Sequence, residues 1–126
     1  MEQRFYICKH CGNIIGLIHD AGVPLLCCGE KMHPLVPNTE DAATEKHLPV
    51  VSREHNLIRV TVGSVEHPMT EQHHIDWIYL QTDRGGQRKC PRLEGAPTVT
   101  FALTDEDQPQ AVFAYCNLHG LWKTEL

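Results

Sequence analysis

Four cysteines within the first 37 residues constrain the fold of this chain more than any other feature of its sequence. Cys8 and Cys11 form a Cys-x-x-Cys pair, and Cys27 and Cys28 are adjacent. A segment this short cannot bury enough apolar surface to offset the conformational entropy that it loses on folding. A metal bound by four thiolates would close the loop between the two pairs and supply the missing stability. We therefore expect residues 1–37 to form a small metal-bound domain.

The donor atoms of this domain leave two metals open, zinc and iron. Four thiolates suit either metal in tetrahedral coordination, and zinc is the more frequent occupant of four-cysteine sites. Gly12 and Gly29 each follow a cysteine pair, and glycine permits the tight turns that point backbone amides at the sulfurs. On the residues alone, zinc is favoured over iron at this first site.

The composition and net charge of the chain limit the class of protein and the compartment that we expect. Its 126 residues are 41% hydrophobic and 21% charged, a composition typical of globular domains. The formal net charge of −5 argues against general nucleic-acid binding. The lack of a long apolar run argues against a membrane span, and the N-terminus lacks the apolar core of a signal peptide, so we expect a cytoplasmic protein. In that reducing compartment, six cysteines and nine histidines indicate transition-metal sites rather than disulfides.

The rest of the chain reads as β-structure. Pro34 and Pro37 mark a connector over residues 34–44, which places the domain boundary near residue 37 and a second domain over 38–126. Pro49 predicts an extended segment around residues 44–50. Hydrophobic patterning predicts strands over 58–62, 75–80, 98–103 and 111–115, with turns at 85–86, 94–97 and 105–109. Short strands at this spacing predict an all-β antiparallel sandwich or barrel without helices.

A second group of metal donors lies in this domain, centred on Cys116 and His119 near the C-terminus. Both follow an apolar run that is typical of a strand. His67 and His73 bracket a loop that contains a proline, and such a loop can aim two imidazoles at one point, which consecutive strand residues cannot. His47 lies in the extended segment upstream. We predict that these five side chains converge on one metal.

Four imidazoles with one thiolate indicate iron rather than zinc at this second site. Zinc prefers four ligands in a tetrahedron, whereas iron accepts five or six. Four nitrogens in a plane with an axial sulfur leave one position open opposite the sulfur, and ferrous iron in this donor set keeps a positive charge that attracts a small anion. The thiolate also donates electron density to the metal. The combination suits one-electron chemistry on a small oxygen species.

Taken together, these motifs resemble the desulfoferrodoxin family, the two-iron superoxide reductases of anaerobic and microaerophilic microbes. The resemblance covers nearly the whole chain, with the motifs in order. Its most specific parts are a Glu-Lys-His triplet and a Cys-Asn-x-His-Gly ending. The motifs are Cys8-x-x-Cys11 with Cys27-Cys28, Glu45-Lys46-His47, His67-Pro68-Met69 with His73, and Cys116-Asn117-x-His119-Gly120.

The resemblance implies two non-haem iron centres and a fold for each domain. Residues 1–37 would be a desulforedoxin-like domain, with iron in place of the zinc favoured above. Residues 38–126 would be an immunoglobulin-like antiparallel β-sandwich that holds the catalytic iron. The implied ligands are Cys8, Cys11, Cys27 and Cys28 for the first iron, and His47, His67, His73 and His119 in the plane with Cys116 on the axis for the second.

The resemblance also implies an activity, two catalytic residues and partners. Members of the family reduce superoxide to hydrogen peroxide without producing dioxygen, as a defence against oxidative stress. Lys46 would draw the anion toward the open position and order the solvent that delivers protons. Glu45 would be the carboxylate that closes this position in the ferric form. Rubredoxin or a similar small redox protein as electron donor, and a homodimer, are further implications.

Three residues that could carry chemistry stand outside both ligand sets. His55 and His74 are expected to be exposed or ordinarily hydrogen-bonded. Cys90 lies between Arg88-Lys89 and Arg92, and neighbouring cations can lower the pKa of a thiol. We expect Cys90 to be an inert loop thiol, with a redox-active or dimer-linking thiol as the alternative.

Two other functions remain open on the sequence. One is an electron carrier in which the four-cysteine iron is the working centre, and the other is a zinc-bound structural or interaction module. The complete set of five donors, with Lys46 and Glu45 beside one of them, favours the reductase.

Overall fold

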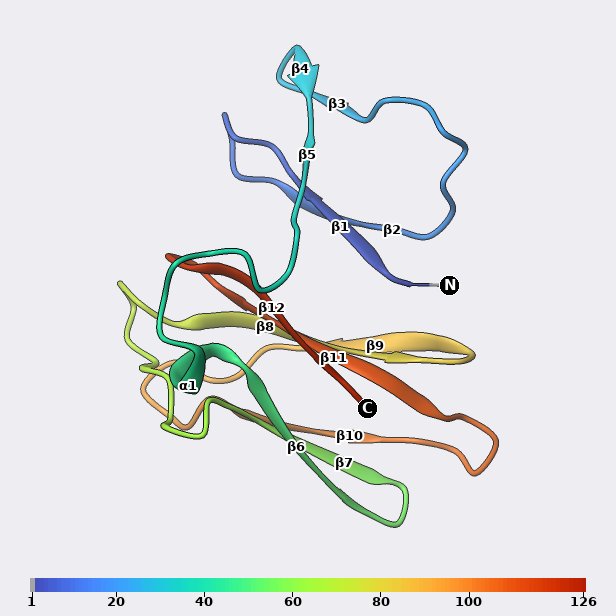
Figure 1. Ribbon diagram of the computed structural model, residues 1–126, viewed down its shortest axis with the longest axis vertical. Helices are drawn as coiled ribbons and strands as arrows, with labels where there is room; N and C mark the ends of the chain where they lie inside the picture. Colours follow the sequence, from blue (N-terminus) through green and yellow to red (C-terminus); the bar gives the residue numbers. More distant parts are fainter. Residues whose placement is uncertain (1) are drawn as a thin grey trace. The chain divides into compact units, whose positions relative to one another are not determined.

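The computed structural model describes residues 2–126, and the contacts within the chain divide it into two units, Met1–Val36 and Pro37–Leu126. Figure 1 shows both units as β-structure joined by one segment. The prediction of an all-β protein is confirmed. Among the described residues, no helix has the length and the apolar character needed to cross a bilayer.

The first unit is built from two small sheets and tight turns. The cysteines lie in or beside these turns, where Gly12 and Gly29 adopt φ of 83° and 76°, and Cys28 adopts 53°. Only glycine adopts such angles at little cost, so both glycines serve the turns as expected. One sheet has the order β2-β1-β5 and the other pairs β3 with β4. The strands are β1 (Arg4–Ile7), β2 (Ile14–Leu17), β3 (Leu26–Cys27), β4 (Glu30–Lys31) and β5 (His33–Pro34).

The second unit is a sandwich of two antiparallel sheets, with the orders β10-β7-β6 and β12-β11-β8-β9. Seven strands divided three and four is the size of immunoglobulin-like sandwiches. The chain enters the second sheet at β8, returns to the first at β10 and crosses again at β11. The strands are β6 (Pro49–Glu54), β7 (Leu57–Val62), β8 (Ile75–Thr82), β9 (Gly85–Lys89), β10 (Thr98–Ala102), β11 (Pro109–Cys116) and β12 (Gly120–Glu125).

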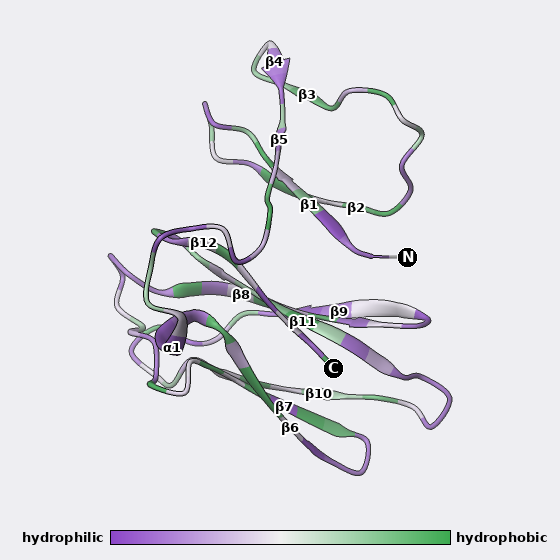
Figure 2. Cartoon of the chain, viewed as in Figure 1, coloured by the Kyte–Doolittle hydropathy of each residue, from purple (hydrophilic) through white to green (hydrophobic). Residues whose placement is uncertain are grey.

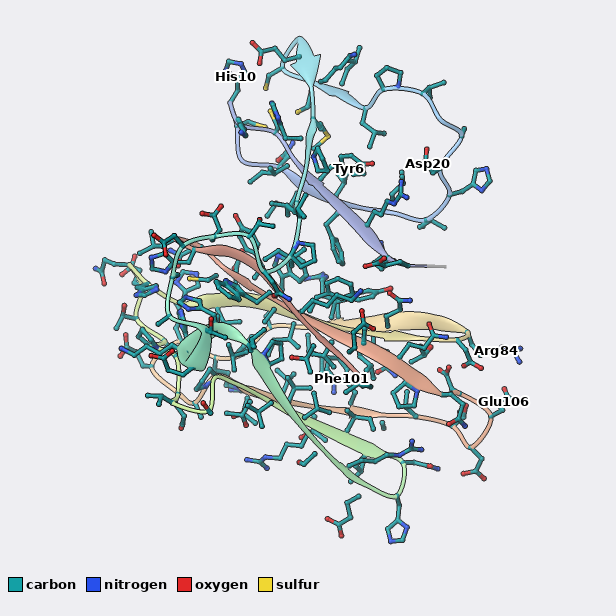
Figure 3. The ribbon with its side chains drawn as sticks, viewed as in Figure 1. Tyr6, His10, Asp20, Arg84, Phe101 and Glu106 are labelled. Atoms are coloured by element: carbon teal, nitrogen blue, oxygen red, sulfur yellow. The ribbon has the colours of Figure 1, made fainter. Side chains whose placement is uncertain are left out.

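The core lies between the two sheets of this unit. Ile58, Val60 and Val62 alternate along β7 with less buried residues and are almost fully buried, as expected for a strand with one face on a core. Phe101 of β10 points into the same layer (Figure 3). Hydrophobic residues follow β6, β7 and β8 in Figure 2. Cys116, at the end of β11, is a fully buried member of this core, so the sulfur sits at the edge of a rigid scaffold.

Two local predictions were wrong. Residues 85–86 do not form the turn, because Gly85 begins β9 and pairs with Thr82. Gly86 is needed there instead for close packing, since an added Cβ would overlap the phenol of Tyr79. Three strands, β6, β9 and β12, were also not anticipated.

The second wrong prediction concerns residues 44–50, which are not extended throughout. Thr44–His47 forms α1, a single helical turn closed by a hydrogen bond from the Leu48 amide to the Thr44 carbonyl at 3.0 Å. Pro49 restricts only the residue before it, and Leu48 is indeed extended, with ψ of 128°. The turn therefore fits before the proline restriction begins.

Candidate metal centres

The four cysteines of the first unit come together as predicted. The ligand atoms of Cys8, Cys11, Cys27 and Cys28 all lie within 4.8 Å of one another. The sulfur of Cys27 lies 3.6 Å from that of Cys11 and 4.0 Å from that of Cys28. A metal about 2.3 Å from each corner of a sulfur tetrahedron sets the sulfurs about 3.8 Å apart. The spacing therefore fits a tetrahedral metal, and Figure 3 shows the sulfur atoms gathered near His10.

The ionisation of these thiols also calls for a cation. Hydrogen bonds from backbone amides, that of Cys11 first, lower the pKa of Cys8 to about 6. Hydrogen bonding to the sulfurs of Cys11 and Cys8 raises the pKa of Cys27 to about 12. Sulfurs this close cannot all be thiolates without a positive charge between them. All six cysteines of the chain are free, so the cluster is not a pair of disulfides.

The second cluster is assembled from four separate parts of the sandwich. His47 ends α1, and His67 and His73 lie in the loop between β7 and β8. Cys116 ends β11, and His119 lies in the turn before β12. The ligand atoms of His47, His67, His73 and Cys116 lie within 4.8 Å of one another. The predicted residues thus meet at one end of the sandwich.

Three of the imidazoles have a buried ring nitrogen that makes no hydrogen bond to the protein. Nδ1 of His47 donates to the Ala43 carbonyl and Nδ1 of His67 donates to the Pro68 carbonyl, each at 2.7 Å. A carbonyl can only accept, so these bonds fix the tautomer that leaves Nε2 unprotonated. The Nε2 atoms of His47, His67 and His73 are buried and have no hydrogen-bond partner. Buried polar atoms without a partner are costly, and a metal ion resolves that cost here.

Burial also keeps these rings neutral and ready to bind a metal. Burial lowers the pKa of His67 to about 4, and it is the main cause that lowers the pKa of His47 and of His73. Metal ligands must be deprotonated, and a lowered pKa meets that condition at neutral pH without displacing a proton.

His119 completes a closed circuit of four rings. Neighbouring ring centroids lie 4.8 Å apart for His47 and His67, 4.6 Å for His67 and His73, 5.2 Å for His73 and His119, and 5.0 Å for His119 and His47. Each pair meets edge to face, at angles between 72° and 86°. Four imidazoles around one point are the arrangement expected for an equatorial plane. Nδ1 of His119 lies 3.8 Å from the sulfur of Cys116, so this is the nitrogen that faces the centre.

The thiol of Cys116 is held by its own turn. Burial raises the pKa of Cys116, and hydrogen bonds from the Leu118 and His119 amides oppose that rise. The register between β11 and β8 shifts between Tyr115 and Cys116, and such irregularities re-aim the side chains next to a site. Gly120 adopts φ of 77°, which gives the turn its sharp bend.

Glu45 and Lys46 stand on the exposed side of α1, next to the buried ring of His47. The carbonyl of Glu45 accepts hydrogen bonds from the Val65 amide at 2.9 Å and from the Ser64 hydroxyl at 3.3 Å. The charge of Lys46 adds a minor part to the lowered pKa of His47 and of His73, after burial. Both charged side chains are therefore close to the cluster and open to solvent.

Trp122 contributes to the site and was missed in the sequence. Its indole stacks on His47, with ring centroids 4.9 Å apart, and its Nε1 donates to the His119 carbonyl at 3.0 Å. The signal that could have found it is its position three residues after His119, on the strand that leaves the turn. It supports two of the four imidazoles at once.

The remaining candidates lie outside both clusters. His55 is exposed in the turn between β6 and β7, and the Nδ1 of His74 bonds to the Thr70 and Glu71 carbonyls at 2.9 and 3.1 Å. These are the ordinary roles expected for both histidines. Cys90 is exposed, with its sulfur 3.6 Å from a guanidinium nitrogen of Arg88.

Two family models match the chain, one for each unit. Residues 1–35 match the desulfoferrodoxin N-terminal domain, and residues 39–125 match desulfoferrodoxin. The desulfoferrodoxin of Nitratidesulfovibrio vulgaris is 43% identical over 124 residues, which cover 98% of this chain and 97% of that protein. The superoxide reductase of Pyrococcus horikoshii is 38% identical over 101 residues, which cover 65% of this chain and 86% of that protein.

Solved structures agree with the sequence relatives. The superoxide reductase of Treponema pallidum matches with a TM-score of 0.84 and 41% identity, over 99% of this chain and 100% of that one. The one-iron superoxide reductase of Giardia intestinalis matches with a TM-score of 0.51 and 34% identity, over 65% of this chain and 99% of that one.

Proposed function

The chain belongs to the desulfoferrodoxin family, and from that premise we propose that it reduces superoxide to hydrogen peroxide at the second cluster, without producing dioxygen. Its two clusters match the two iron centres of the family, Fe(Cys)4 and Fe(His)4Cys. The observation that carries the proposal is the closed circuit of four imidazoles beside one buried cysteine sulfur. A structural zinc site would need only four of these five donors.

We assign the ligands as the sequence predicted them. Cys8, Cys11, Cys27 and Cys28 hold the first iron. His47, His67, His73 and His119 would hold the second iron together with Cys116. The unpartnered Nε2 atoms and the sulfur spacing support this assignment. Ferrous iron held at the second cluster would supply the one electron that superoxide takes up.

The protein residues around that position attract the substrate and complete the reaction. Superoxide is an anion, and the exposed ammonium of Lys46 raises its local concentration. The reduction consumes one electron and two protons for each superoxide, and Lys46 orders the water through which the protons arrive. The carboxylate of Glu45 would be the protein group that closes the open position of the second centre. The amides of Leu118 and His119 oppose the rise that burial causes in the pKa of Cys116, and a bound cation would complete the deprotonation of its sulfur.

The partners and the compartment of the protein follow from the same premise. The electron that restores the ferrous form comes from rubredoxin or a similar small redox protein. The protein acts as a homodimer in the cytoplasm, where a reducing environment keeps the cluster thiols free for metal.

Removing either end of the Cys116-to-His119 turn tests this function. Cys116→Ser and His119→Ala should each abolish the reduction of superoxide, because one removes the only thiolate and the other opens the imidazole plane. Pulse radiolysis of the reduced protein measures the rate directly. The matched control is Cys90→Ser, which removes a thiol outside both clusters and should retain the wild-type rate. Wild-type rates in the two site variants would refute the assignment of the site.

A further inference from the structure

The turn that carries Cys116 is fastened to the loop that carries His73 by one asparagine. The side-chain amide of Asn117 donates from Nδ2 to the Gln72 carbonyl at 3.0 Å, and its Oδ1 accepts from the His74 amide at 2.9 Å. The backbone amide of Asn117 also donates to the His74 carbonyl at 3.2 Å. The bonded residues stand immediately before and after His73. A single carboxamide therefore brackets this histidine on both sides.

His73 depends on such backbone anchoring more than His47 and His67 do. His47 and His67 are each oriented by a hydrogen bond from Nδ1 to a carbonyl. Within the described part of the chain, His73 has no corresponding bond from its ring. Its backbone is held from the other direction by Thr70, whose hydroxyl accepts from the His73 amide at 3.1 Å and whose amide donates to the His73 carbonyl at 3.0 Å. Apart from its edge-to-face contacts with His67 and His119, the ring is placed through the main chain.

The hydrogen bonds to Gln72 and His74 require both the N–H donor and the oxygen acceptor of a carboxamide. Gln72 offers a carbonyl, which needs a donor, and His74 offers an amide N–H, which needs an acceptor. Aspartate keeps the acceptor but loses the donor and sets a negative oxygen against the Gln72 carbonyl. Alanine loses both bonds. Because Asn117 is exposed, water can satisfy the freed groups, but water cannot fix the distance between two loops.

We propose that Asn117 is the positioning residue of the second centre, which holds His73 in register with Cys116 across two loops. This rests on the proposed function only in taking His73 and Cys116 as ligands of one iron. Residues that orient ligands typically contribute about 10–100-fold to metal affinity. Loss of the bracket would leave His73 in several positions around the metal, while His47 and His67 keep their hydrogen bonds to carbonyls.

Iron release and the spectrum of the ferric protein test this role. Full-length two-iron Asn117→Ala, Asn117→Asp and Asn56→Ala are compared with the wild type. Asn56→Ala is the matched control, because Asn56 bonds to Asp105 at 2.7 Å next to the other end of β7. The reduced proteins are mixed with a ferrous chelator, and the ferric proteins are examined by electron paramagnetic resonance. The two centres differ in symmetry, so their signals separate.

We expect iron to be lost from the second centre alone, at rates that differ between the variants. Asn117→Ala should release iron from that centre about 10–100-fold faster than the wild type, with its ferric signal split into more than one species and the first-centre signal unchanged. Asn117→Asp should release iron at an intermediate rate, and Asn56→Ala at the wild-type rate. A wild-type spectrum and release rate in Asn117→Ala overturn the proposal.

A folding failure and a failure of the proposed function both give distinct results. If Asn117→Ala does not fold, Asn117→Asp decides: faster release than in Asn56→Ala supports the role, and equal release overturns it. Neither readout depends on turnover. A wild-type protein that binds iron at the second centre but does not reduce superoxide refutes the proposed function and leaves the test of Asn117 intact.

Discussion

Two kinds of contact fix the ligating side chains of the second cluster before any metal arrives. Carbonyls select the Nδ1–H tautomer of His47 and of His67, so that Nε2 faces the centre. The indole of Trp122 then packs on His47 and bonds to the backbone of His119. Such partners of ligands raise ligand basicity and fix ring orientation. The protein therefore presents a largely preorganised donor set.

The charge of Lys46 leads to a prediction for the rate of the reaction with superoxide. Lys46→Ala should slow the second-order reaction with superoxide by about 10-fold, because an exposed cation beside the site steers a small anion. The dependence of this rate on ionic strength should also become flatter, since salt screens the same attraction. Pulse radiolysis at several salt concentrations measures both effects.

The matched control for that measurement is Lys89→Ala. Lys89 is an exposed cation of β9 that bonds to the Thr100 carbonyl at 2.6 Å, away from the cluster residues. The substitution Lys89→Ala changes the net charge of the protein by the same amount as Lys46→Ala. If both variants react at the wild-type rate, Lys46 is an ordinary surface charge.

The placement of α1 depends on a single glycine, Gly63. Gly63 adopts φ of 88°, a region that side chains rarely enter. A Cβ there would overlap the Val65 carbonyl and lie 2.9 Å from both the Glu45 carbonyl oxygen and the Lys46 carbonyl carbon. The helical turn that carries Glu45, Lys46 and His47 thus packs directly on this position.

Gly63→Ala should therefore destabilise the second unit by about 1–3 kcal/mol through backbone strain alone, and displacement of α1 should reduce iron occupancy at the second centre. Both tryptophans, Trp77 and Trp122, lie in this unit, so urea unfolding followed by tryptophan fluorescence reports on it. Gly85→Ala is the matched control for backbone strain, because Gly85 also has a positive φ, of 146°, but no atom lies within 4 Å of the added Cβ. Losses of stability and of iron in Gly63→Ala no greater than those in Gly85→Ala would contradict the role of Gly63.

The elements also show what the sequence could and could not predict. Alternation in residues 58–62 predicted β7, because one face of that strand meets the core and the other does not. The turn of α1 could not be predicted in this way, since four residues are too few for a helical period. Its carbonyl at Glu45 is satisfied by Ser64 and Val65, which are distant in sequence. The motifs predicted which residues bind the metal, but only the fold shows which ring nitrogen each histidine turns toward the centre of the cluster.

For the whole molecule, the two units make two metal centres with separate supports. The first has few buried side chains, so its stability depends on the metal. The second has a continuous hydrophobic core that includes Cys116. Loss of one centre should therefore leave the other unit folded.

Cys8→Ser tests this independence. The variant should lose the first iron and the order of Met1–Val36, because three thiolates no longer close the tetrahedron. It should retain the second iron, wild-type unfolding by tryptophan fluorescence, and reduction of superoxide by the pre-reduced protein. Amide hydrogen exchange locates the loss within the chain. Complete inactivity of the pre-reduced variant would show that the two centres are coupled.

The most direct test of the central claim is the yield of hydrogen peroxide per superoxide consumed by the fully reduced, two-iron protein. Reduction takes one electron from the protein and converts each superoxide into one hydrogen peroxide. Dismutation instead forms one hydrogen peroxide and one dioxygen from every two superoxides. A superoxide reductase should give one peroxide per superoxide, with oxidation of the second centre and no dioxygen evolved. A yield of one peroxide for two superoxides, with dioxygen released, would contradict it.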